Sequence, residues 1–141
     1  MRIVLDTVVI IRALLDPESW SGRILFRHAN DYEFIVSAAI NAEYLDVTSR
    51  PGISSKLARR NRNVSGLLDL LARATEVAPD VVPAICRDPG DDKFLAAALA
   101  AGANYLVSED RDLLDMGEYE GIPIVSTQTM IDLLTARDAQ P

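Results

Sequence analysis

The chain has 141 residues, of which 49% are hydrophobic and 25% are charged. This length and balance are typical of one globular domain with a single buried core, and they exclude a disordered chain. A single cysteine, Cys86, excludes an internal disulfide, and no apolar run is long enough to span a membrane. A strand pattern begins directly after Met1 with no signal peptide before it, so we expect a cytoplasmic protein.

The net charge of −7 argues against unspecific binding of nucleic acid by the whole surface, but the charges are unevenly distributed. Residues 88–120 contain nine acids, opposed by Lys93 and Arg111. Residues 49–68 contain five basic residues and no acid. This basic segment could attract phosphate groups, although a solvated helical face is the simpler interpretation. Its basic residues are Arg50, Lys56, Arg59, Arg60 and Arg62.

Strand and helix patterns alternate along the chain. We expect strands at residues 3–5, 34–36, 76–78, 105–107 and 122–125. We expect helices at residues 8–15, 19–29, 38–49, 54–61, 65–74, 92–101 and 127–136, with a helical turn at 111–114. Pro51 and Gly52 indicate the end of the third helix, and three prolines between residues 79 and 90 indicate a loop. Strands separated by helices predict one three-layer α/β/α domain over residues 1–141, with a central parallel sheet.

Acidic residues recur just beyond the strands of this predicted sheet. Asp6 follows the first strand and Asp110 follows the fourth. Asp92 opens the helix that leads into the fourth strand, and Glu43 lies on the helix after the second. Because the carboxyl ends of parallel strands share one edge of a sheet, these acids could converge there. Two carboxylates about 4 Å apart repel by roughly 4 kcal/mol at an effective dielectric of about 20, and a bound divalent cation removes this penalty.

The kind of metal follows from the available ligands. The chain has one histidine, His28, against 21 acidic residues. This inventory favours a hard ion that prefers oxygen ligands, such as Mg²⁺ or Mn²⁺. His28 follows Arg27 on an expected surface helix, so we do not expect it to bind a metal.

Each acid also has a purely structural interpretation. Asp6 suits a helix N-cap, and Glu43 suits a solvated helix face. Either Asp91 or Asp92 could cap the helix that starts there, and because adjacent side chains on a helix diverge, at most one of them reaches a shared pocket. Asp110 and the nearby Asp112 could both be turn residues. The coincidence of four acids at one edge, rather than any single one, favours the metal site.

Five short stretches, which span nearly the whole chain, resemble a known family. They are Ile3-Val-Leu-Asp6-Thr7, Ser37 with Glu43 six residues later, Arg87-Asp-Pro-Gly-Asp-Asp92-Lys-Phe-Leu-Ala-Ala, Ala103-Asn-Tyr-Leu-Val-Ser108-Glu-Asp110-Arg-Asp112-Leu-Leu and Gly121-Ile-Pro-Ile-Val-Ser-Thr. Together they are similar to the PIN-domain nucleases, and in particular to the VapC-like toxins of bacterial toxin–antitoxin pairs. Each stretch alone is a weak signal, but the combination is specific.

The resemblance implies a ribonuclease that uses one or two Mg²⁺ or Mn²⁺ ions to hydrolyse RNA. It carries the metal-binding roles onto Asp6, Glu43, Asp92 and Asp110. It also implies an additional acid at Asp112 and supporting roles for Thr7 and Ser108. The implied partners are an RNA substrate, contacted by the basic residues of segment 50–62, a cognate antitoxin protein and a second copy of the chain in a homodimer.

One position departs from the family pattern, since Val8 stands where the family usually has an asparagine. An alternative function is therefore a catalytically weakened PIN fold that acts only as an interaction protein. A third interpretation is a phosphatase of the haloacid-dehalogenase type with Asp6 as nucleophile. That chemistry needs a second aspartate two residues later, at the position of Val8, and we rank it last.

Overall fold

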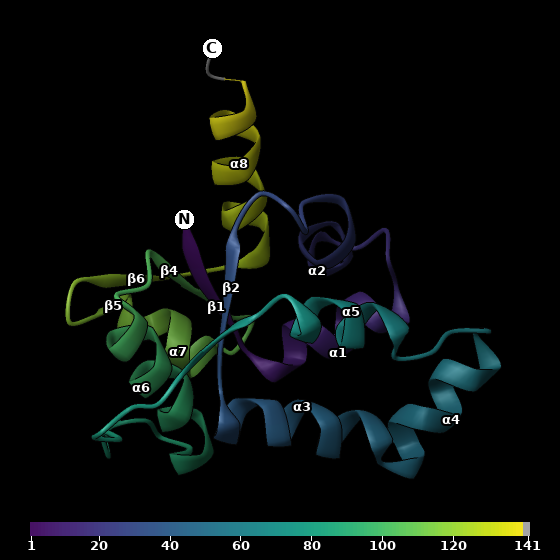
Figure 1. Ribbon diagram of the computed structural model, residues 1–141, viewed down its shortest axis with the longest axis horizontal. Helices are drawn as coiled ribbons and strands as arrows, with labels where there is room; N and C mark the ends of the chain where they lie inside the picture. Colours follow the sequence, from purple (N-terminus) through teal and green to yellow (C-terminus); the bar gives the residue numbers. More distant parts are fainter. Residues whose placement is uncertain (140–141) are drawn as a thin grey trace.

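The computed structural model describes residues 1–139 and places six strands in one sheet (Figure 1). The strands are β1 (Arg2–Leu5), β2 (Glu33–Ser37), β3 (Thr75–Val77), β4 (Tyr105–Val107), β5 (Glu118–Tyr119) and β6 (Ile122–Val125), in the order β3-β2-β1-β4-β6-β5. Neighbouring strands from β3 to β6 are parallel, which confirms the predicted fold class. The edge strand β5 is antiparallel to β6 and was not predicted, because two residues are too short for a periodic pattern.

Helices cover both faces of the sheet in the described part of the chain. They are α1 (Thr7–Leu15), α2 (Trp20–Gly22), α3 (Ala38–Ser49), α4 (Pro51–Arg59), α5 (Ser65–Ala72), α6 (Asp92–Ala101), α7 (Arg111–Met116) and α8 (Thr127–Asp138), with a π-helical turn η1 (Arg23–Arg27) and a 3₁₀ turn η2 (Pro89–Asp91). In Figure 1, α1, α3, α4 and α5 lie together to one side of the strands, and α6 and α7 lie to the other. None of the helices within residues 1–139 is long and apolar enough to cross a membrane.

Two expected helices begin or continue differently in the structure. The helix expected at residues 19–29 is a short α2 that passes into the π-helical turn η1. Helix α3 ends at Ser49, before Pro51, as expected, but the next helix, expected from residue 54, already begins at Pro51. Proline suits a first helical position, because the N–H that it lacks would be unpaired there anyway. Arg50 before it is extended, as a residue preceding proline prefers, and this separates α3 from α4.

Polar residues directly after the strands start the helices that follow. Val9 N–H donates to the Asp6 carboxylate, Ile40 N–H to the Ser37 hydroxyl and Thr129 N–H to the Ser126 hydroxyl. Each bond satisfies one of the free N–H groups at a helix start. The strands before them are buried, with Ile3, Val4 and Leu5 of β1 all at 0% exposure. The apolar run therefore fixes the sheet, and the capping residues line its carboxyl edge.

Candidate active site

Asp6 and Ser108 lie side by side at the carboxyl edge of the sheet. Leu5 pairs with Val107 in the parallel register of β1 and β4, and Asp6 N–H donates to the Val107 carbonyl at 3.0 Å. The residues that follow the two strands are thereby neighbours. The Ser108 hydroxyl donates to Asp6 Oδ2, and Val9 N–H donates to Asp6 Oδ1 at 3.2 Å. Burial raises the pKa of Asp6, and the hydrogen bond from Ser108 opposes the rise.

Asp110 and Asp91 complete a group of three acids at this edge. Ser108 Oγ accepts a hydrogen bond from Asp110 N–H at 2.9 Å, so one buried hydroxyl holds both Asp6 and Asp110. The pKa of Asp91 is raised to about 7, first by burial and then by the neighbouring side chain of Asp110. The negative charges of Asp110, Asp88 and Asp6 act in the same direction. Hereafter Asp6, Asp91 and Asp110 are called the acid cluster.

Asp92, the residue expected in this group, has a different environment. Its Oδ1 accepts hydrogen bonds from Cys86 N–H at 2.8 Å and from Ile85 N–H at 3.2 Å. The bond from Cys86 lowers the pKa of Asp92. The carboxylate therefore fastens the loop before α6, whereas the Asp91 side chain makes no capping bond and lies against Asp110. Of these two adjacent acids, the sequence prediction placed Asp92 in the cluster and the structure places Asp91 there.

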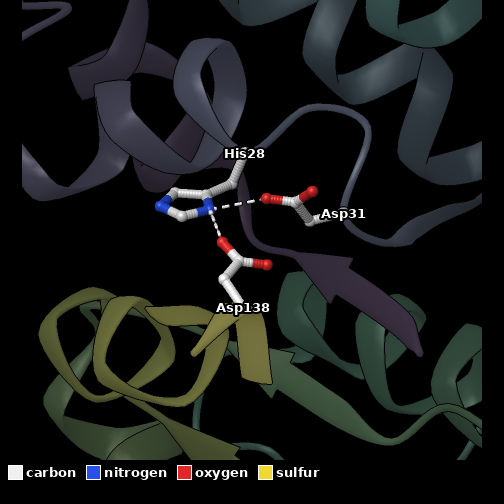
Figure 2. A group of neighbouring side chains, drawn as sticks. All are labelled: His28, Asp31 and Asp138. Atoms are coloured by element: carbon white, nitrogen blue, oxygen red, sulfur yellow. Dashed lines mark hydrogen bonds and ion pairs between the residues drawn. The ribbon is translucent and has the colours of Figure 1, made fainter. Parts of the chain in front are cut away.

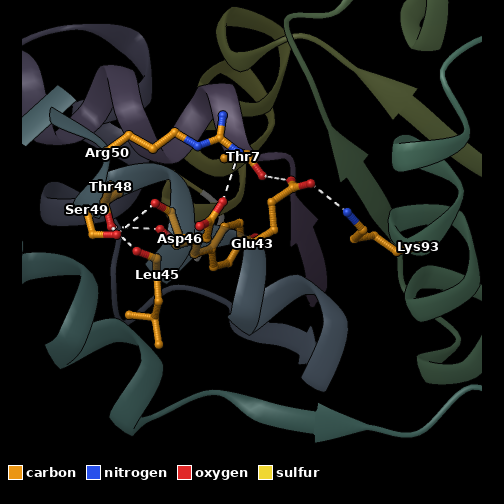
Figure 3. A network of polar contacts seen from close by, with 9 residues as sticks. Thr7, Glu43, Leu45, Asp46, Thr48, Ser49, Arg50 and Lys93 are labelled. Carbon is orange, nitrogen blue, oxygen red and sulfur yellow. Dashed lines mark hydrogen bonds and ion pairs between the residues drawn. The ribbon is translucent and has the colours of Figure 1, made fainter. Parts of the chain in front are cut away.

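Glu43 is held beside the acid cluster by two other side chains. Thr7 Oγ1 donates to Glu43 Oε2, and Lys93 Nζ lies 2.5 Å from Glu43 Oε1 (Figure 3). Thr7 thus fixes the orientation of the Glu43 carboxylate. Sequence reasoning counted Lys93 only as an opposing charge, because nothing in the local pattern links it to a residue 50 positions earlier.

The acid cluster provides oxygen donors but is more open than a closed metal cage. Within residues 1–139, the metal-ligating side chains whose donor atoms all lie within 4.8 Å of one another are instead His28, Asp31 and Asp138. The donors of the acid cluster are carboxylate oxygens beside a serine hydroxyl, which suits Mg²⁺ or Mn²⁺. The raised pKa values of Asp6 and Asp91 indicate negative charge that a cation would compensate.

His28, which we expected on a surface helix, is buried in the structure. It is 8% exposed, because it follows the turn η1, on which α8 packs. Its Nδ1 lies 2.8 Å from Asp31 Oδ2 and 3.7 Å from Asp138 Oδ2 (Figure 2). This His–carboxylate contact links the end of α8 to the segment before β2.

Asp112 and Val8 lie at the margin of the site. Asp112 is exposed, and its Oδ1 is 3.5 Å from Arg87 Nη1. Its backbone N–H donates to Asp110 Oδ1 at 2.9 Å, so Asp110 caps α7. Val8 is 43% exposed beside Asp6. Asp6 is held by Ser108 and the N–H of Val9, so its orientation does not depend on a polar side chain at position 8.

The basic segment is partly used for structure. Arg60 donates to the Leu15 carbonyl at 3.2 Å and Arg62 to the Leu14 carbonyl at 3.0 Å, at the end of α1. Lysine and arginine near a helix C-terminus stabilise its free carbonyl groups. Arg50 pairs with Asp46 at 2.8 Å. Lys56 and Arg59, the other two members of the segment, are exposed on α4.

Comparisons with known proteins agree with this architecture. Residues 2–112 match the family described as PIN domain. A solved structure with a similar fold is VapBC2 from Rickettsia felis, bound to a DNA fragment from their promoter. It aligns with a TM-score of 0.57 and 15% identity, over 89% of this chain and 98% of that one. No curated protein sequence matches the chain. Because the matched residues make up more than half of its length, the chain belongs to the PIN domain family.

Proposed function

We propose that the protein is a divalent-metal-dependent ribonuclease and the toxin of a toxin–antitoxin pair. The observation that carries the proposal is the acid cluster, in which Ser108 joins Asp6 and Asp110 and in which Asp91 lies against Asp110. Carboxylates brought together at a sheet edge, with the pKa values of Asp6 and Asp91 raised, are typical of a functional site rather than of a stabilising contact. PIN domains are generally nucleases, which agrees with this chemistry.

In the proposal, Asp6, Asp91 and Asp110 hold the ion, and Glu43 closes the site beside them. A bound Mg²⁺ or Mn²⁺ would supply Lewis-acid chemistry there, namely a lower pKa for water and compensation of negative charge on the phosphate. Ser108 orients the carboxylate of Asp6 and holds the backbone of Asp110, so that Asp6 and the chain at Asp110 are in place before substrate arrives. Asp92 keeps the loop before α6 in place and with it the position of Asp91.

The biological part of the proposal rests on the similarity in fold to VapBC2 from Rickettsia felis, which was solved bound to a DNA fragment from their promoter. We infer an antitoxin partner for this chain, encoded by a neighbouring gene. Single-stranded or looped RNA is the proposed substrate, since an open site at a sheet edge reaches a splayed backbone more easily than one in a duplex. A cytoplasmic location and a homodimer remain parts of this proposal.

The test is cleavage of single-stranded RNA by the purified chain with Mn²⁺, with Mg²⁺ and with a chelator. We expect cleavage with either metal, none with the chelator, and loss of cleavage in Asp6→Asn and Asp110→Asn. Asp132→Asn is the matched control, because Asp132 is an exposed acid on α8 and its replacement should leave the rate unchanged. An intact RNA with every metal, in a folded chain that still binds its antitoxin, would favour the interaction protein with a weakened site.

A further inference from the structure

Lys93 brings a positive charge to the edge of the proposed metal site. Its Nζ lies 2.5 Å from Glu43 Oε1, and the two side chains are 23% and 26% exposed (Figure 3). The surface pair of Arg50 and Asp46 has exposures of 62% and 65%. Because solvent and salt screen the Lys93–Glu43 pair less, its attraction is stronger than that of an ordinary surface ion pair.

Both oxygens of Glu43 already have partners. Oε2 accepts the hydrogen bond from Thr7, and Oε1 is paired with the Lys93 ammonium. The charge of Glu43 is thereby compensated within the folded chain. Asp91 is in the opposite situation, since its neighbours Asp110 and Asp6 are themselves acids. Of the four acids, Glu43 therefore has a positive charge beside it, whereas Asp91 in the acid cluster has negative charges beside it.

Residues at the start of one helix contribute both to the acid cluster and to the ion pair with Glu43. Asp91 immediately precedes α6, and Lys93 is the second residue of α6. Side chains two positions apart on a helix point in well-separated directions, so one turn can direct an acid to the cluster and a cation to Glu43. The ammonium of lysine is a compact charge with three N–H donors, of which Glu43 uses one.

We propose that Lys93 takes the place of a second metal ion, so that the chain binds one divalent ion, on the acid cluster, and carries a fixed cation beside Glu43. This inference rests on the proposed function and specifies its metal site. A positive charge at that place faces the phosphate that the site would cleave and stabilises the charge that develops there. Removal of the ammonium leaves Glu43 as a partly buried carboxylate with a free oxygen, which is a ligand for a second ion.

The test counts Mn²⁺ ions bound per chain, by calorimetric titration and equilibrium dialysis of the full chain at neutral pH. We expect one ion for the wild type, one for Lys93→Arg, which keeps the charge, and two for Lys93→Met. The second ion should disappear again in Lys93→Met combined with Glu43→Gln. Lys56→Met is the matched control, since it removes the same charge from an exposed position on α4 and should leave one ion bound.

Two results would overturn the inference. They are two ions bound by the wild type, and one ion bound by both the wild type and a folded Lys93→Met chain. If Lys93→Met does not fold, Glu43→Gln alone decides: it should bind one ion with unchanged affinity, and a tenfold loss would show that Glu43 is already a ligand. A wild-type chain that binds no ion contradicts the proposed function itself, so the two failures are distinguishable.

Discussion

The carboxyl group of Asp91 lies near that of Asp110 at the edge of the sheet where β1 and β4 end, and this neighbour raises the pKa of Asp91. The pKa of Asp91 is raised to about 7, chiefly by burial and further by the nearby Asp110. One residue later, the pKa of Asp92 is lowered by the hydrogen bond from Cys86 N–H. The pKa values of these two neighbouring carboxyl groups are thus shifted in opposite directions. Asp91 is surrounded by other acids, whereas Asp92 accepts hydrogen bonds from the backbone.

This difference predicts how stability depends on pH in the absence of metal. The pKa of Asp91 rises from 3.8 to about 7 on folding, so between these values the folded chain holds a proton that the unfolded chain releases. The free energy of unfolding should therefore fall as pH rises from about 4 to about 7 and level off above. Asp6, whose pKa is also raised, acts in the same direction.

Urea unfolding at a series of pH values with a chelator present measures this slope. Asp91→Asn should flatten it between about pH 4 and pH 7, whereas Asp92→Asn should leave the slope in that range unchanged, because the lowered pKa of Asp92 makes this group titrate only below about pH 4. Equal slopes for the wild type and Asp91→Asn would show that Asp91 is not the group that titrates.

Binding of Mn²⁺ to the acid cluster should stabilise the fold. At a hundredfold excess over Kd the gain is about 2.7 kcal/mol, because the ion binds the native chain and not the unfolded one. Thermal melts with and without Mn²⁺ measure it. The shift should be nearly lost in Asp110→Asn and retained in Asp138→Asn, which removes a carboxylate from the separate contact with His28. A melting temperature that does not respond to millimolar Mn²⁺ would rule out the shared site.

Ser108 should position two members of the acid cluster. It is 0% exposed, donates to Asp6 and accepts from Asp110 N–H. We expect Ser108→Ala to weaken Mn²⁺ binding by about tenfold, since groups that orient metal ligands commonly have effects of this size. Ser108→Thr keeps the hydroxyl and should retain most of the affinity. Equal titration curves for Ser108→Ala and the wild type would remove Ser108 from the site.

The basic segment should separate into a structural pair and an RNA-binding pair. Arg60→Ala and Arg62→Ala should each destabilise the fold by about 1 kcal/mol, because each removes a hydrogen bond to the end of α1. Lys56→Ala with Arg59→Ala should leave stability unchanged and weaken RNA binding, with a shallower dependence on salt. Binding is measured in the Asp110→Asn chain so that the RNA stays intact. Unchanged RNA affinity in the Lys56 and Arg59 double variant would place the RNA elsewhere.

The sequence predicted the parts of the fold that depend on local pattern. Strand β4, with bounds Tyr105–Val107, and helix α6, with bounds Asp92–Ala101, have the predicted bounds. Their apolar runs are buried, and Gly102 ends α6 with a positive φ of 59°, which glycine adopts without strain. The placement of Asp6 and Ser108 at one edge follows from the parallel sheet alone.

The parts that were missed depend on tertiary structure. Which of Asp91 and Asp92 joins the cluster is decided by the proline-containing loop, which presents the N–H groups of Ile85 and Cys86 to Asp92. No periodic pattern describes such a loop. The pairing of Glu43 with Lys93 connects separate helices, and the burial of His28 depends on α8, nearly 100 residues later in the chain. The spacing of residues along the sequence does not predict these contacts.

The most direct test compares RNA cleavage by Asp91→Asn and Asp92→Asn with Mn²⁺ present. The structure predicts that Asp91→Asn loses activity by on the order of 100-fold or more, since it removes a carboxylate from the acid cluster. Asp92→Asn should keep most of the activity, because asparagine still offers an oxygen to the N–H groups of Ile85 and Cys86. The reverse pattern, with Asp92 essential and Asp91 dispensable, would contradict the assignment of the metal site.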